Sequence, residues 1–328
     1  MINFEYTRVS SVKAAIDTLA KNPAGGFIAG GTNLIDLMKK GVTAPARLID
    51  INNLPLKQIE EDKTTGIRIG ALALNSDVAE HEAVQKKYPL LALALKAGAS
   101  AQLRNMATVG GNMMQRTRCG YFYDTTMPCN KRQPGSGCGA LHGYNRMHAI
   151  FGANEKCIAV HPSDMCVALA ALDTTVQLSG PKGDRTILFT DFHRLSGDMP
   201  EKDNTLQKGE LITGITVPAN KFIKNVSYVK IRDRASYAFA LVSVAAALEL
   251  DGNTIRAARL AMGGVAHKPW RLSAAEQFLE GKPATVQTFE QAAAIAMKGA
   301  RSYGYNDFKL KLAPAAIVQA LTQALEIK

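Results

Sequence analysis

One stretch of sequence decides the fold: Phe27-Ile28-Ala29-Gly30-Gly31-Thr32-Asn33-Leu34. Its apolar start, glycine pair and polar end predict a short strand, a tight turn and the start of a helix. Because glycine adopts positive φ and lacks a Cβ, such a turn can approach a ligand closely. The free N–H groups of the helix start favour an anion such as a pyrophosphate. On this stretch alone, an ordinary turn before a helix explains the pattern equally well.

A second polar glycine turn strengthens the nucleotide interpretation. It combines a hydroxyl, a glycine pair and an amide, and reads Arg104-Asn105-Met106-Ala107-Thr108-Val109-Gly110-Gly111-Asn112. Neither turn contains the Gly-x-Gly-x-x-Gly fingerprint or the Gly-Lys-Ser/Thr of a P-loop. Two such turns in one chain predict two sides of one extended nucleotide site. A bulky residue at Gly31 is expected to place its Cβ in the path of the phosphates.

The pattern along the chain predicts an α/β (α+β) fold in three units, residues 1–57, 58–220 and 221–328. The first two units alternate short strands with helices, and the third reads as an antiparallel sheet followed by helices. The segment at about 113–157 interrupts the second unit. It is rich in Gly, Cys, Arg and aromatic residues and lacks helical or strand periodicity, so it predicts a structured insertion.

Local signals predict the limits of several helices. Ser11 is expected to cap a helix that ends near Lys21, and Asn75 is expected to cap another. A third helix is expected from Phe289 to Tyr303. The last helix is expected from Pro314 to Ile327, because proline suits a first helical position that needs no N–H partner.

Composition and charge exclude some classes of protein. Apolar residues make up 47% of the 328 residues, so a sizeable core is expected. The net charge of +11 is dispersed, and no DNA- or RNA-reading motif is present, so a nucleic-acid partner is not expected. No apolar run reaches the ~20 residues of a membrane helix, and no secretory signal is apparent at the start. A non-enzymatic, basic nucleic-acid-binding protein with structural zinc is the alternative from another class.

Four cysteines are candidate metal ligands: Cys119, Cys129, Cys138 and Cys157. Zinc sites usually contain closely paired cysteines, which are missing here, and the spacing also differs from common ferredoxin patterns. By spacing alone, the type of metal site stays open. Between Arg104 and Arg146 there are six basic residues and one acidic residue, which favours an anionic iron–sulfur cluster. Cys166 lies in an apolar helix start and is expected to be a buried free thiol.

Beyond these cysteines, the sequence offers no catalytic apparatus. The six histidines form no metal pair at helical spacing, and no nucleophile motif such as Gly-x-Ser-x-Gly is present. We therefore expect no catalytic residue on this chain.

The two glycine turns, together with His161-Pro162-Ser163-Asp164, Lys230 and Gly263-Gly264-Val265-Ala266, resemble the flavoproteins of the molybdenum hydroxylases. That family includes the flavin portions of xanthine dehydrogenase, carbon monoxide dehydrogenase and aldehyde oxidoreductases. The resemblance covers nearly the whole chain. It implies a two-part FAD-binding fold of the molybdopterin dehydrogenase type, followed by a C-terminal antiparallel sheet with helices of the carbon monoxide dehydrogenase flavoprotein type.

The resemblance also implies roles for individual residues. Asp164 would bind ribityl or ribose hydroxyls, and Lys230 would lie near the flavin ring, where a cation stabilises an anionic reduced flavin. The implied FAD-binding residues are Gly26, Phe27, Ile28, Ala29, Gly30, Gly31, Thr32, Asn33, Leu34, Thr108, Gly111, Asn112, Asp164 and Lys230.

Three stretches of the insertion carry a closer resemblance: Arg-Thr-Arg-Cys-x-Tyr-Phe-Tyr-Asp-Thr from Arg116, Pro-Cys-Asn-Lys-Arg from Pro128 and Pro-Gly-Ser-Gly-Cys from Pro134. They resemble the flavin subunits of bacterial periplasmic aldehyde oxidoreductases, which carry a [4Fe–4S] cluster. The resemblance implies an electron-transfer subunit whose four cysteines hold this cluster. Its partners would be a molybdenum-cofactor subunit and a [2Fe–2S] subunit in a heterotrimer. Co-export with a signal-bearing partner would place the complex in the periplasm, with the cytoplasm as the alternative. The flavin subunit of a 4-hydroxybenzoyl-CoA reductase is the competing relative, because it also carries such a cluster.

Overall fold

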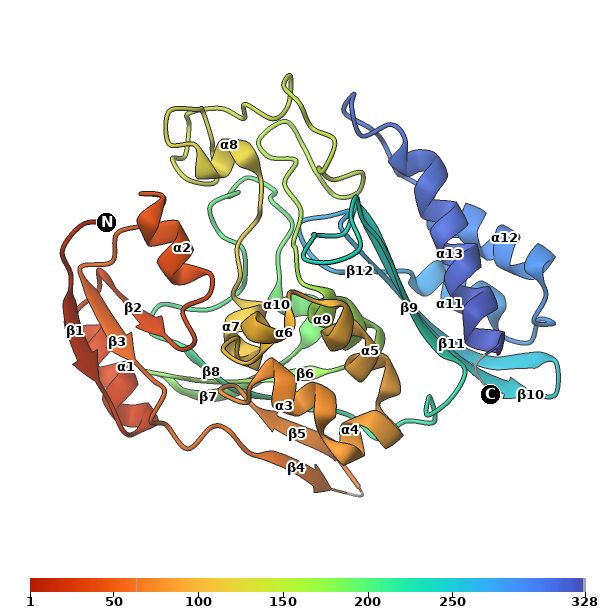
Figure 1. Cartoon of the computed structure of the whole chain (residues 1–328), viewed down its shortest axis with the longest axis horizontal. Helices are drawn as coiled ribbons and strands as arrows, with labels where there is room; N and C mark the ends of the chain where they lie inside the picture. The colour runs from red at the N-terminus through yellow and green to blue at the C-terminus, as the bar shows by residue number, and fades with distance from the viewer. Residues whose placement is uncertain (63, 327–328) are drawn as a thin grey trace.

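The computed structural model describes residues 1–62 and 64–326, which form three sheets with helices packed on them (Figure 1). The first sheet is parallel, in the order β1-β3-β2, and comprises β1 (Glu5–Arg8), β2 (Gly25–Ile28) and β3 (Arg47–Asp50). Helices α1 (Val12–Lys21) and α2 (Leu34–Lys39) follow its first two strands. Ser11 caps α1 as predicted, because its Oγ accepts the N–H of Ala14 at 3.1 Å.

The second sheet is antiparallel, in the order β4-β5-β8-β6-β7. Its strands are β4 (Ile59–Asp62), β5 (Gly66–Gly70), β6 (Thr175–Gly180), β7 (Gly183–Leu188) and β8 (Leu211–Val217). The associated helices are α3 (Asn75–Glu80), α4 (Glu82–Lys87), α5 (Pro89–Ala97), α6 (Ala101–Arg104), α7 (Val109–Met113), α9 (Asp164–Ala171) and α10 (Phe189–Phe192). Fully buried Ile67 and Ile69 of β5 share one apolar core with Leu90 and Leu91 of α5. Each such side chain contributes about 1.5–3 kcal/mol by leaving water.

The predicted insertion lies between α7 and α9 and consists mostly of loops. Its short helix α8 (Gly120–Tyr123) lies near α2, and its loops extend toward the third sheet (Figure 1). Cys129 and Cys138 face each other across an isolated antiparallel bridge. The insertion therefore brings two of the four candidate metal ligands together through its backbone.

The third sheet is antiparallel, in the order β12-β11-β10-β9, and comprises β9 (Val226–Ile231), β10 (Val242–Asp251), β11 (Thr254–Gly263) and β12 (Trp270–Arg271). Helices α11 (Ser273–Leu279), α12 (Val286–Ala296) and α13 (Lys309–Glu326) follow it. Helix α13 covers one face of the sheet, whereas α5 and α9 contact the other (Figure 1). The predicted limits of the three units stay predictions.

Several predicted helix limits are wrong. Asn75 is the first residue of α3 rather than its cap, and its side chain makes no capping hydrogen bond among the described residues. Helix α12 ends at Ala296 instead of Tyr303, and Gly299 with φ of +82° lies in the turn that follows. Pro314 lies inside α13, which begins at Lys309. The predicted end at Ile327 lies outside the described residues.

The structure was also searched for membrane-spanning helices. Among the described residues, no helix combines the length and apolar character that crossing a membrane requires.

Candidate cofactor site

The two predicted glycine turns lie against each other. A Cβ built on Gly30 would clash with the carbonyl oxygen of Met106, so only glycine permits this approach of the two backbones. Thr108 caps α7, because its Oγ1 accepts the N–H of Gly111 at 3.2 Å. The helix start in the second turn is therefore fixed beside the first turn.

A cavity of about 750 Å³ opens beside these turns. Its volume lies within the ~300–1,000 Å³ range that is usual for ligand pockets. The predicted cofactor-binding residues that line it are Thr32, Asn33, Gly111, Asn112, Asp164 and Lys230. The other predicted residues belong to elements behind this lining: Gly26, Phe27 and Ile28 in β2, Ala29, Gly30 and Gly31 in the turn, Leu34 in α2, and Thr108 at the cap of α7.

The structure shows a role for glycine at position 31 in the turn itself. A Cβ on Gly31 would meet the side chains of Ile35 and Ile28, at 3.1 and 3.4 Å. That this Cβ would also enter the path of the phosphates stays a prediction. The φ angle of Gly31 is +69°, a conformation that other residues adopt only with strain. Glycine is therefore required here by the backbone of the turn.

Asp164 and Lys230 form a buried ion pair in the cavity wall, with Oδ2 and Nζ 2.7 Å apart. Tyr228 donates its hydroxyl to the other carboxylate oxygen at 2.8 Å. Burial raises the pKa of Asp164, whereas the ammonium group of Lys230 opposes this shift. The two side chains that the resemblance assigns to different parts of the flavin nucleotide thus contact each other.

Arg118 is a further cation in the same wall. Its Nη1 donates to the hydroxyl of Tyr123 at 2.7 Å and its Nη2 to Oε1 of Gln115 at 3.2 Å. Its guanidinium group also lies 5.0 Å from the ring centre of Phe239. A guanidinium group in this position suits an anionic ligand. In the sequence, Arg118 contributes to the basic excess of the insertion, and it was not predicted to line the nucleotide site. Its place beside Cys119 was the available signal.

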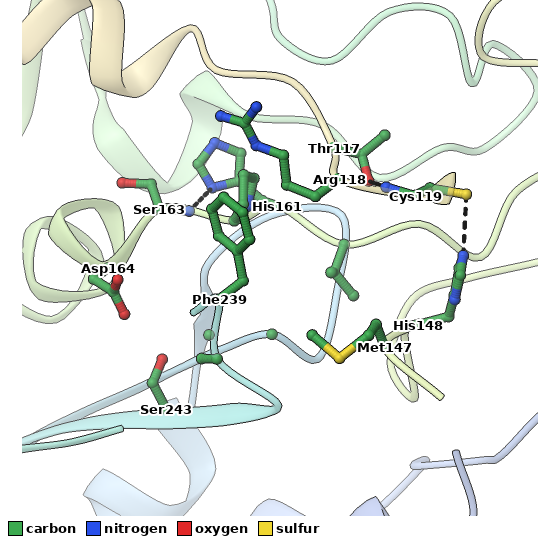
Figure 2. A pocket seen from close by; sticks show the side chains of 15 residues that line it. Thr117, Arg118, Cys119, Met147, His148, His161, Ser163, Asp164, Phe239 and Ser243 are labelled. Carbon is green, nitrogen blue, oxygen red and sulfur yellow. Dashed lines mark hydrogen bonds between the residues drawn. The ribbon is translucent and has the colours of Figure 1, made fainter. Parts of the chain in front are cut away.

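A second cavity, of about 240 Å³, adjoins the first and shares Arg118, Asp164 and Phe239 with it. Figure 2 shows Asp164 on one side of this cavity and Cys119 with His148 on the other. Nε2 of His148 lies 3.1 Å from Sγ of Cys119. The second cavity therefore links the wall of the candidate nucleotide site to the first candidate metal ligand.

The structure gathers the four cysteines of the insertion as free thiols. Burial raises the pKa of Cys119 to about 12, and the neighbouring thiols of Cys157 and Cys129 add to the shift. Burial likewise raises the pKa of Cys157 to about 11, with additions from Cys138 and Cys129. Together with the backbone bridge between Cys129 and Cys138, these couplings indicate that the four thiols share one region of the insertion. Among the described residues, they do not form a group whose sulfur atoms all lie within 4.8 Å of one another.

Hydrogen-bond donors and a cation oppose these shifts. Backbone N–H groups of Phe122 and Tyr121 lower the pKa of Cys119, and Lys131 together with the N–H of Ala159 lowers that of Cys157. Donors and positive charge directed at sulfur stabilise a thiolate. These groups offset only part of the effect of burial, and the pKa values of both thiols stay raised.

Sequence spacing missed one group. His161, Cys166 and His193 each bring a ligand atom to within 4.8 Å of the others, and all three are buried. Burial lowers the pKa of His193 to about 4 and that of His161 well below its ordinary value, so both rings are neutral. Nδ1 of His161 accepts the N–H of Ser163 at 3.4 Å, which places the remaining ring proton on Nε2. Because Nε2 of His161 carries this proton, the neutral rings of His161 and His193 are better suited to pack against each other than to bind a cation together.

Two consecutive parts of the chain match two family models. Residues 2–220 match the FAD binding domain in molybdopterin dehydrogenase, and residues 227–324 match the CO dehydrogenase flavoprotein C-terminal domain. The chain belongs to the FAD-binding subunits of the molybdenum hydroxylase family. This confirms the resemblance inferred from the glycine turns. As a member of this family, the chain is a subunit of an oxidoreductase.

Curated relatives and solved structures extend this membership over the whole chain. The chain is 49% identical to the aldehyde oxidoreductase FAD-binding subunit of Escherichia coli, covering 98% of each chain. It is 33% identical to the glyceraldehyde dehydrogenase medium chain of Sulfolobus acidocaldarius, covering 85% of this chain and 82% of the relative. A carbon monoxide dehydrogenase structure from Hydrogenophaga pseudoflava matches with a TM-score of 0.78 at 28% identity, covering 99% of both chains. The predicted fold is therefore confirmed for this flavoprotein.

Proposed function

We propose that this chain binds FAD and a [4Fe–4S] cluster and serves as the electron-transfer subunit of a molybdenum-dependent aldehyde oxidoreductase. One observation carries the proposal: the cavity beside the two glycine turns continues, through the second cavity, to Cys119 of the four-cysteine insertion. Bound flavin and cluster would supply two-electron and one-electron transfer respectively. A chain that holds both groups side by side is suited to pass electrons between proteins.

The larger cavity fits the chemistry of a dinucleotide. Arg118 places a positive charge in the wall for an anionic ligand. The first N–H groups of α7 are already bonded within the protein, to Ala73, Ala71 and Thr108. Asp164 offers acceptors for sugar or ribityl hydroxyls, and Lys230 offers a cation for the flavin ring. These features support the assignment of FAD to this cavity.

The insertion fits a [4Fe–4S] cluster. Its ligands would be Cys119, Cys129, Cys138 and Cys157, with N–H donors directed at the sulfur atoms. Four ligands of a cluster bind different iron atoms, so their sulfur atoms need not converge as tightly as ligands of a single ion. Binding would require the buried thiols to lose their protons, and the bonds between iron and the thiolates would offset that cost.

The relatives support aldehyde as the substrate class of the complex. The names of the relatives from Escherichia coli and Sulfolobus acidocaldarius both specify aldehyde oxidation. The sequence contains no nucleophile motif such as Gly-x-Ser-x-Gly, and the contact of Cys119 with His148 belongs to the cysteine insertion, so we assign the chemistry on the aldehyde to a molybdenum-cofactor partner. A [2Fe–2S] partner would deliver electrons to the FAD, which would pass them to an external acceptor. We further propose that a signal-bearing partner carries the assembled heterotrimer to the periplasm.

The test is analysis of the complex purified with its partners. We expect one FAD and about four iron atoms bound to this chain, flavin reduction on addition of an aldehyde, and no aldehyde oxidation by the chain alone. If the complex accepted an aromatic thioester as its substrate and did not react with aldehydes, the result would instead favour a 4-hydroxybenzoyl-CoA reductase. Zinc in place of iron would overturn the cluster assignment. Cell fractionation tests the location, and a complex found only in the cytoplasm would contradict export.

A further inference from the structure

His148 is the side chain that joins the second cavity to the cysteine cluster. Its Nε2 lies 3.1 Å from Sγ of Cys119, the contact drawn as a dashed line in Figure 2. The ring is buried, and it lies beside the ring of Tyr121 with the ring centres 6.4 Å apart. Such a contact between a ring nitrogen and sulfur is a hydrogen bond whose direction depends on which atom carries the proton.

The position of the ring is fixed from the C-terminal unit. The carbonyl oxygen of His148 accepts hydrogen bonds from Nζ of Lys309 at 2.9 Å and from Nδ2 of Asn306 at 3.3 Å. The N–H of His148 donates to the Asn145 carbonyl oxygen at 3.0 Å. Lys309 is fully buried and also donates to the Gly264 carbonyl oxygen at 2.7 Å. The backbone that carries the imidazole is therefore held at its carbonyl oxygen by two groups remote in sequence and at its N–H by a nearby turn.

We propose that His148 donates its Nε2–H to the Cys119 thiolate and thereby raises the reduction potential of the cluster. This inference rests on the proposed function, because it requires the cluster. A cluster-bound thiolate carries no proton, so only the imidazole can act as donor in this contact. A donor directed at a ligand sulfur stabilises the extra negative charge of the reduced cluster more than the charge of the oxidised one.

His148 is thus a positioning residue that acts through Cys119. Its place in the wall of the second cavity, across from Asp164 of the candidate FAD site, lets it set the driving force for electron transfer between the two groups. The other N–H donors near Cys119 belong to the backbone of Tyr121 and Phe122 and cannot be removed by substitution. His148 is the side-chain donor that mutation can test.

The test compares His148→Leu with His148→Gln in the purified holo-complex. Leucine removes the donor, whereas the glutamine amide nitrogen can occupy the place of Nε2. His142 is an exposed histidine of the same insertion, so His142→Leu is the matched control. Each variant is analysed for iron content, and the cluster signal is followed by electron paramagnetic resonance during a redox titration.

We expect full iron content in all variants and a lower midpoint potential in His148→Leu alone. A tenfold fall in the ratio of reduced to oxidised cluster at a fixed potential corresponds to about 59 mV for one electron. An unchanged potential in iron-replete His148→Leu overturns the inference and leaves the proposed function intact. Loss of iron in both leucine and glutamine variants also overturns it, because His148 would then be structural. Wild-type complex without iron on this chain refutes the proposed cluster itself.

Discussion

Asp203 anchors the cysteine-containing insertion through an ion pair with Lys131, whose side chain is only 2% exposed. The same carboxylate pairs with Arg116, with Oδ2 and Nε 2.6 Å apart. Lys131 also donates to the Pro200 carbonyl oxygen at 2.6 Å. One acidic residue outside the insertion therefore neutralises two cations that lie on either side of Cys119 in the sequence.

Asp203→Asn is expected to loosen the insertion. Removing one partner of a buried pair leaves an uncompensated charge and costs about 3–5 kcal/mol. We expect lower stability in urea unfolding and reduced iron retention. Asp198 pairs with Lys156 on the surface, where both side chains are at least half exposed, so Asp198→Asn should cost less than about 1 kcal/mol. Equal stability of the two variants would show that Asp203 is not an anchor.

The ion pairs of Asp203 also predict a dependence on pH. Burial alone would raise its pKa, but Lys131 and Arg116 lower it to about 2, below the ordinary value of 3.8. A lowered pKa in the folded state stabilises the protein fully above pH 3.8, and this contribution is lost as the pH falls toward 2. The difference in unfolding free energy between wild type and Asp203→Asn should therefore shrink below about pH 4. A constant difference from pH 7 to pH 3 would contradict this origin.

Gly30→Ala is expected to separate the two glycine turns. The added Cβ would come within 1.8 Å of the Met106 carbonyl oxygen, so the backbone must move. Overpacking of this kind costs about 1–3 kcal/mol, and FAD content should fall with it. Gly120 is the matched control, because a Cβ there meets nothing within 4 Å and the residue is not among the predicted FAD-binding residues. Flavin absorbance and urea unfolding of both variants provide the measurement.

Lys230→Met is expected to weaken both the fold and FAD binding. Asp164 would lose its buried ion-pair partner at 2.7 Å, at a cost of about 3–5 kcal/mol, or would take up a proton. Lys221 pairs with Glu249 at 3.2 Å on the surface, so Lys221→Met should change stability by less than about 1 kcal/mol. FAD dissociation constants and unfolding curves of the two variants test this. A wild-type affinity in Lys230→Met would exclude a role for the ammonium group at the flavin.

Local signals in the sequence predicted the parts of the fold that depend on neighbouring residues. The cap at Ser11 and the glycine turns follow from side chains within a few positions of one another. Strand β7 carries no such signal, because it is an edge strand with mostly exposed polar side chains and therefore has no buried face. Pro314 was misplaced, because the turn at Asn306 starts α13 before the proline.

Contacts between distant segments explain why the rest of the site could not be predicted from the sequence. Lys230 meets Asp164, and Asp203 meets Lys131, across more than sixty residues of sequence. His161, Cys166 and His193 come from three segments whose spacing has no local period. Helix α9 packs on the third sheet, to which Lys230 belongs, and against α10, which ends just before His193. The family resemblance named Asp164 and Lys230 as candidate residues, but it did not predict that they contact each other.

Replacing single cysteines tests which thiols hold the proposed cluster. Cys129→Ser should lower the iron content of the chain from about four atoms, because the four thiolates share one cluster and binding is coupled to the order of the insertion. Cys129 is 7% exposed and faces Cys138 across a backbone bridge, so loss of the cluster should also expose the insertion to proteolysis. Iron analysis and limited proteolysis measure the two effects.

Cys166→Ser is the matched control, because Cys166 is also buried but lies in α9, beside His161 and His193. Its replacement should leave iron content unchanged and cost about 1 kcal/mol for burying a hydroxyl. Unchanged iron in Cys129→Ser would refute the ligand assignment, whereas iron loss in Cys166→Ser alone would move the metal to the histidine group. The pair of variants therefore separates the two places in this chain where thiols and possible metal ligands gather.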